Sequence, residues 1–246
     1  MLGQDRVQSP LTSSTQILVV TTADWSAVEG TLQRYERSTP RKHWRPVGPS
    51  IPVVVGKTGL GWGTGVVAKD SEDIRSASDP VKKEGDGRAP AGIFRLGTAF
   101  GYASQAPGSW RMHYLALTPS VECVDDTKSS SYNRVVDRSG ATVDWNSSEH
   151  MLRLDDLYRW GIVVQHNSAP ATPGLGSCIF MHIWRGPGQP TVGCTAMQKE
   201  NIETVLSWLD PAAAPMLMQL PVPAYQSLKK RWKLPKLPRS HRVTAE

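Results

Sequence analysis

The chain has 246 residues, of which 39% are hydrophobic and 20% are charged, and it carries a net charge of +6. This length and composition fit one large or two small globular domains and exclude a disordered or collagen-like chain. No apolar run approaches the roughly eighteen residues that a membrane helix needs, and the longest candidate is residues 17–20. The sequence therefore predicts no transmembrane segment.

The first part of the chain predicts a leader, a strand and a short helix. Residues 1–15 are rich in Gln, Ser and Thr and are interpreted as a flexible leader, in which no secretory signal is legible. Residues 16–22 form a β-branched run typical of a strand, and Asp24 is suited to cap a helix. The apolar face of that helix would comprise Trp25, Val28, Leu32 and Tyr35.

Short strands and a glycine-rich loop follow. Residues 43–47 and 51–55 predict strands, and residues 56–65 form the loop. A phosphate-binding loop requires a lysine after its glycines and a helix behind it. Lys57 instead precedes most of the glycines, and no helical pattern follows. The loop therefore does not predict a nucleotide site.

The rest of the chain alternates loops and strands, with two further helices. Residues 69–92 are polar and predict a loop, and the strands are predicted at 93–96, 112–117, 161–165, 177–184 and 216–220. Helical spacing predicts one helix over 147–160, from Met151, Leu154, Leu157 and Tyr158, and a clearer one over 197–209. Many short strands with Gly and Pro turns favour a mainly β fold, a sandwich of mixed sheets with few helices.

Cys194 has the sequence context of a nucleophile. It directly precedes the helix predicted from residue 197, and Thr195 with Gln198 matches a capping box. The sequence thus predicts a thiol at a helix N-terminus, where the helix dipole favours the thiolate. Gly193 leaves room for a substrate carbonyl, and the backbone N–H groups of Gly193 and Cys194 are expected to face the oxyanion that forms.

A general base is predicted twelve residues upstream, at His182. Residues 185–190 form a loop long enough to bring His182 back beside Cys194. The imidazole of such a pair is oriented by a third group, and Thr191 is expected to fill that role through its hydroxyl or its carbonyl. Cys194, His182, Thr191 and Gly193 are therefore the predicted catalytic residues.

These residues resemble a known family signature. The order His182, Thr191, Gly193, Cys194 is similar to the H-x(n)-[ST]-x-G-C pattern of the L,D-transpeptidase catalytic domain, the YkuD family. Residues 84–94 resemble that family's K-x-G-x-x-T-P-x-G-x-F stretch. The resemblance spans roughly residues 50–220. It departs from many members at two sites: Ile183 follows the histidine in place of Gly, and Ala196 stands two residues after the cysteine in place of Arg.

The resemblance implies an L,D-transpeptidase-like β-sandwich that acts on the cell wall from the periplasm or cell envelope. Such enzymes form a cysteine acyl-enzyme with a peptidoglycan stem peptide, release D-Ala and pass the acyl group to an amine of a neighbouring stem. Carbapenems would acylate Cys194. Two alternatives stay open: an L,D-carboxypeptidase or amidase that uses water as acceptor, and a catalytically silent module that binds the wall.

Three residues are candidate substrate contacts, and no cofactor is required. Arg185 is expected to supply a cation for a substrate carboxylate, and His166 and Trp184 are expected to line a cleft for a glycopeptide. A zinc site is disfavoured because the three cysteines contain no C-x-x-C pair. The sequence therefore predicts a site without metal.

The other two cysteines and the end of the chain leave alternatives open. Cys123 and Cys178 form either a disulfide or a pair of packed thiols. Residues 16–222 are assigned to the catalytic domain and residues 223–246 to a basic tail, since the last twenty residues hold seven of the 28 Lys and Arg residues. The tail either contacts an anionic lipid or wall polymer or is a solvated end. Nucleic acid is disfavoured because the remaining chain is electrically balanced, and the oligomeric state is undetermined.

Overall fold

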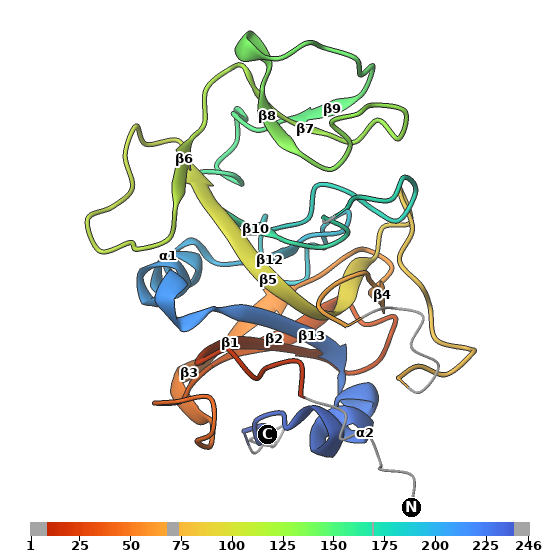
Figure 1. Cartoon of the computed structure of the whole chain (residues 1–246), viewed down its shortest axis with the longest axis vertical. Helices are drawn as coiled ribbons and strands as arrows, with labels where there is room; N and C mark the ends of the chain where they lie inside the picture. The colour runs from red at the N-terminus through yellow and green to blue at the C-terminus, as the bar shows by residue number, and fades with distance from the viewer. Residues whose placement is uncertain (1–8, 68–73, 169, 239–246) are drawn as a thin grey trace, which may run out of the picture.

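A computed structural model describes residues 9–67, 74–168 and 170–238 (Figure 1). Its main feature is a ten-stranded mixed sheet with the strand order β10-β11-β12-β3-β2-β1-β13-β5-β4, in which β6 also pairs with β5. Because β10 pairs with β5 as well as with β11, the sheet closes on itself around the core. The prediction of a mainly β fold with mixed sheets is confirmed.

The strands of this sheet have the following bounds: β1 Gln16–Thr22, β2 Glu29–Glu36, β3 Arg45–Val54, β4 Leu60–Trp62, β5 Ala89–Gly101, β6 Tyr114–Ala116, β10 Trp160–Val164, β11 Phe180–Ile183, β12 Thr195–Met197 and β13 Met216–Pro221. The run QILVVTT forms β1 as predicted, parallel to β13 and antiparallel to β2. Ile17, Leu18, Val19 and Val20 are all buried, which is typical of a strand covered on both faces.

A second sheet is inserted between β6 and β10. It is antiparallel and comprises β7 Val121–Val124, β8 Val135–Asp137 and β9 Ser148–His150, with the short 3-10 helix η1 Arg138–Gly140. We call residues 121–150 the inserted sheet; it lies at the opposite end of the molecule from α2 (Figure 1). A disulfide between Cys123 on β7 and Cys178 ties it to the segment that leads into β11, which settles the open question of that pair.

Two α-helices and the 3-10 helix η2 Pro211–Ala213 complete the fold. Helix α1 Lys199–Trp208 buries Ile202, Val205 and Leu206 in the main core. Helix α2 Val222–Trp232 follows β13 directly and buries Tyr225, Leu228 and Trp232. No helix in the described ranges is both long and apolar enough to span a bilayer.

The described ends of the chain pack onto the main sheet. At the N-terminal end Leu11 is buried, and the Ser9 hydroxyl donates to the Trp232 carbonyl oxygen over 2.6 Å. At the other end the Tyr35 hydroxyl donates to the carbonyl oxygen of Lys236 over 2.8 Å. Residues 9–15 and 223–238 therefore contribute to the core, although we expected a flexible leader and a tail there. The remainder of both segments lies outside the described residues.

The helix predicted after Asp24 is wrong. The Asp24 carboxylate accepts the N–H groups of Ser26 and Ala27, each over 2.8 Å, and so closes a turn rather than starting a helix. The chain then enters β2, which pairs on one side with β1 and on the other with β3. Hydrogen bonding to two neighbouring strands outweighs the local helical spacing.

The helix predicted over 147–160 is also wrong. Its first residues form β9, paired with β7, and the chain then runs irregularly to β10. Leu154, which the helical reading placed on the buried face, is fully exposed, while Met151 and Tyr158 are buried in a second apolar cluster with Cys123 and Cys194. The helical spacing is therefore coincidental, because Met151 and Tyr158 are buried through tertiary contacts and not on one face of a helix.

Candidate active site

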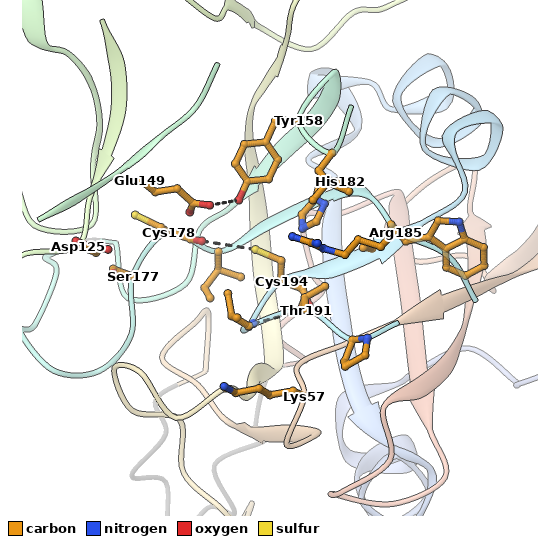
Figure 2. Close-up of a pocket in the computed structure, with 18 of the residues that line it drawn as sticks. Lys57, Asp125, Glu149, Tyr158, Ser177, Cys178, His182, Arg185, Thr191 and Cys194 are labelled. Atoms are coloured by element: carbon orange, nitrogen blue, oxygen red, sulfur yellow. Dashed lines mark hydrogen bonds between the residues drawn. The ribbon is translucent and has the colours of Figure 1, made fainter. Parts of the chain in front are cut away.

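Two neighbouring parallel strands carry the candidate nucleophile and base. His182 lies on β11 opposite Ala196 of β12, and Cys194 immediately precedes β12. Because side chains alternate along a strand, Cys194 and Ala196 face the same side as His182. All three line one cavity of about 410 Å³. Figure 2 shows the Cys194 thiol and the His182 ring within this cavity, with the Arg185 guanidinium beside them.

Cys194 is a buried thiol, only 5% exposed, and the free cysteine of the chain. Its Sγ accepts the Phe180 N–H over 3.3 Å and donates its own proton to the carbonyl oxygen of Cys178 over 3.7 Å. Burial raises the pKa of the Cys194 thiol to about 12. The sulfur therefore rests in its protonated form.

The prediction that a helix N-terminus activates Cys194 is wrong. Strand β12 separates Cys194 from α1, which begins at Lys199. The Thr195 hydroxyl donates to the Gln219 side-chain oxygen over 2.7 Å instead of capping the helix. Residues 195–197, which the sequence pattern assigned to the start of the helix, instead form β12 and pair with β11 and β3.

His182 is a buried, neutral imidazole whose Nδ1 is held by the backbone. Burial lowers its pKa to about 4, and its ring packs edge-on against Tyr158 at 5.1 Å between centroids. Its Nδ1 lies 2.7 Å from the carbonyl oxygen of Ile183. Because a carbonyl only accepts, Nδ1 carries the proton and Nε2 holds the lone pair.

Thr191 shapes the turn before Cys194 and does not orient His182. Its hydroxyl donates to the Cys194 carbonyl oxygen over 2.7 Å and accepts the Gly193 N–H over 3.1 Å. The expected contact between Thr191 and His182 is replaced by the Ile183 carbonyl, which the strand geometry places next to the ring. The Gly193 N–H donates to the Thr191 hydroxyl oxygen in this structure. Its role in binding an oxyanion stays a prediction.

The three predicted substrate contacts have different outcomes. Arg185 and Trp184 line the cavity together with Cys194. His166 is instead 1% exposed, with Nδ1 accepting the Thr64 N–H over 3.2 Å and Nε2 donating to the Leu175 carbonyl oxygen over 2.9 Å. Both ring nitrogens are therefore occupied by the fold, and His166 has no free group for a substrate.

A comparison with known protein families shows which family this chain belongs to. The model of YkuD, the L,D-transpeptidase catalytic domain, matches residues 21–222. The chain belongs to the YkuD family. No curated protein matches this sequence.

Among solved structures, the helical cell shape determining protein Pgp2 from Campylobacter jejuni matches with 14% sequence identity and a TM-score of 0.38. The match covers 87% of this chain and 52% of Pgp2, so the chain spans about half the length of that protein.

The cavity of this YkuD domain also contains charged residues that the sequence did not reveal. From the inserted sheet, Glu149 accepts the Tyr158 hydroxyl over 2.6 Å, and burial raises the pKa of the Glu149 carboxyl. Lys82 also lines the cavity, and its ammonium pairs with Asp86 over 2.7 Å. No local pattern marks Glu149 as a cavity residue, because the inserted sheet reaches the cavity only through tertiary folding.

Within the ranges that the structure describes, no group of three His, Cys, Asp or Glu side chains is arranged to hold a metal ion. Cys194 and His182 place a protonated thiol and a neutral imidazole in one cavity.

Proposed function

We propose that this YkuD domain is a peptidoglycan L,D-transpeptidase in which Cys194 forms the acyl-enzyme. The observation that carries the proposal is the shared cavity of Cys194 and His182, in a chain that belongs to the L,D-transpeptidase family. The donor would be the tetrapeptide stem, cut after the L-centre of its diaminopimelate. The acceptor would be an amine of a neighbouring stem, so that the product is a peptide cross-link.

The protonation states suggest the order of the first steps. Because the thiol pKa is raised to about 12 and the imidazole pKa is lowered to about 4, the resting pair is neutral rather than a thiolate–imidazolium pair. His182 Nε2 would take the thiol proton as Sγ attacks the substrate carbonyl. The tetrahedral intermediate then expels D-Ala, whose amine receives that proton from His182, and a thioester remains on Cys194.

The second half of the reaction decides between transfer and hydrolysis. An acceptor amine gives its proton to His182, attacks the thioester and releases the Cys194 thiolate, which takes the proton back. Water in place of the amine would give an L,D-carboxypeptidase or an amidase with the same residues. Arg185 and Trp184, which line the cavity, are the proposed contacts for the stem peptide.

The proposed location is the cell envelope, where peptidoglycan is found. The basic residues of the C-terminal segment, among them the exposed Lys230, Lys233 and Lys236, would contact an anionic envelope surface there. Each basic residue near such a surface contributes about 1 kcal/mol.

The test is mass spectrometry of the products formed from disaccharide-tetrapeptide by the wild type and by Cys194→Ala. Dimers that have lost D-Ala, absent with the variant, are the expected result, and their fragmentation locates the cross-link. Shortened monomers alone would replace transpeptidation by hydrolysis. Unchanged substrate would contradict both reactions and favour a module that only binds the wall.

A further inference from the structure

The residues that contact the Cys194 sulfur belong to a short segment with an unusual backbone. Cys178 has a φ of 54°, in the left-handed region that residues with a side chain rarely adopt. Its carbonyl oxygen accepts the Cys194 thiol proton, and two residues later the Phe180 N–H donates to the same sulfur. The conformation at Cys178 therefore sets both polar contacts of the candidate nucleophile. Figure 2 shows the contact between Cys178 and the Cys194 sulfur.

Two restraints hold Cys178 in this conformation, and both come from residues 121–150. The first is the disulfide to Cys123 on β7, with 5.9 Å between the two Cα atoms. The second is Asn133, whose side-chain oxygen accepts the Cys178 N–H over 2.9 Å. The inserted sheet is thus joined to the sulfur's surroundings by one covalent bond and one hydrogen bond.

Asn133 is itself firmly anchored. Its side-chain nitrogen donates to the carbonyl oxygens of His166 and Asn167, over 2.9 and 2.7 Å. The same amide group therefore links the end of β10 to Cys178, and only Asn or Gln offers both a donor and an acceptor of this kind. Asn133 does not line the cavity, so its influence on the sulfur passes through Cys178.

We propose that Asn133 and the Cys123–Cys178 disulfide are positioning groups for the Cys194 sulfur, and that full activity requires the disulfide to be formed. This inference rests on the proposed function of Cys194 as nucleophile. Reduction by dithiothreitol would convert the disulfide to two thiols while the reagent closes to its cyclic disulfide. The Cys178 carbonyl and the Phe180 N–H would then lose their fixed places beside the sulfur. A newly synthesised chain in a reducing compartment would have low activity until oxidation restores them.

The first experiment compares the oxidised protein, the reduced protein and the double variant Cys123→Ser/Cys178→Ser, which retains Cys194 as its single thiol. We expect kcat to fall about a hundredfold in both altered forms with little change in KM, the scale of loss for a displaced reacting group. Reoxidation should restore the reduced wild type, whereas dithiothreitol should leave the double variant unchanged. An unaltered kcat in the folded, reduced protein would overturn the proposal.

Asn133 variants keep the disulfide and test the proposal should the double variant be unfolded. Asn133→Ala removes all three hydrogen bonds, whereas Asn133→Gln retains an amide with both a donor and an acceptor. We expect a lower kcat for Asn133→Ala and partial rescue by Asn133→Gln. Tyr225→Phe, which loses a buried hydrogen bond to Pro235 on the far side of the core, controls for a general loss of stability. Equal losses in Asn133→Ala and Tyr225→Phe would refute a positioning role.

Alkylation of Cys194 by iodoacetamide separates this inference from the proposed function, since it needs no substrate. Releasing Cys178 should open the buried sulfur, so we expect alkylation about tenfold faster in the reduced protein and in Asn133→Ala, and unchanged in Tyr225→Phe. If the wild type turns over no stem peptide, the proposed function fails but this rate still judges the positioning role. An unchanged alkylation rate would overturn the positioning role alone.

Discussion

Acid should destabilise this protein through its buried neutral histidines, and His166 offers the cleanest test because it lies outside the cavity. Burial lowers the pKa of His166 to about 4. Between pH 6.5 and pH 4 the unfolded chain therefore binds a proton at His166 that the folded protein excludes. The stabilising contribution is complete above pH 6.5 and is lost as the pH falls towards 4.

The magnitude follows from the size of the shift. A change from 6.5 to about 4 corresponds to about 3 kcal/mol of unfolding free energy at 1.36 kcal/mol per pKa unit, an upper value for so buried a group. His166→Gln keeps a donor for the Leu175 carbonyl, but its amide oxygen does not replace Nδ1 across the ring, so the Thr64 N–H loses its acceptor at a cost of about 1–3 kcal/mol at neutral pH. The variant should thus be less stable at pH 7.5, and its deficit should shrink as the pH falls.

The measurement is urea unfolding of the wild type and His166→Gln at pH 7.5, 6, 5 and 4.5. Carboxylates with lowered pKa, such as Asp144 at about 2, act below this range and contribute equally to both proteins. His43→Gln, at an exposed histidine, is the matched control and should run parallel to the wild type. Parallel curves for His166→Gln and the wild type over the whole range would refute the burial argument.

Further predictions concern the site and the C-terminal segment. Cys194→Ala should abolish turnover and cost less than about 1.5 kcal/mol of stability, measured by product analysis and urea unfolding. A carbapenem should add its mass to the wild type and not to Cys194→Ala, as intact-protein mass spectrometry would show. His182→Gln should lower kcat by about 10²–10⁴-fold in a steady-state assay because it removes the proposed base, and a smaller loss would assign that role elsewhere. Trp232→Ala should destabilise the protein by about 3–5 kcal/mol in urea unfolding, since Trp232 is only 2% exposed; a change below 1 kcal/mol would restore the view of a loose tail.

Local sequence patterns predicted the secondary structure correctly where the residues of a segment themselves determine its burial. The run at residues 16–22 is apolar on both faces and becomes β1, and residues 216–220 become most of β13. The sequence also pointed to the mainly β class and to Cys194 and His182, whose motif spacing reflects two adjacent strands and their connection. The periodicity of 197–209 identified α1, although the helix begins two residues later.

Tertiary structure decided what depends on partners remote in sequence. β2 and β9 are strands because neighbouring strands offer hydrogen bonds that outweigh a helical spacing of apolar residues. For the same reason Cys194 lies directly before strand β12 and not at the N-terminus of a helix, as the sequence predicted. Burial at this position keeps its thiol protonated. Only folding could reveal that the inserted sheet reaches the cavity and that Asn133 and Cys123, outside the cavity, bind Cys178. Residues that are 45 and 55 positions apart leave no periodic signal in the chain.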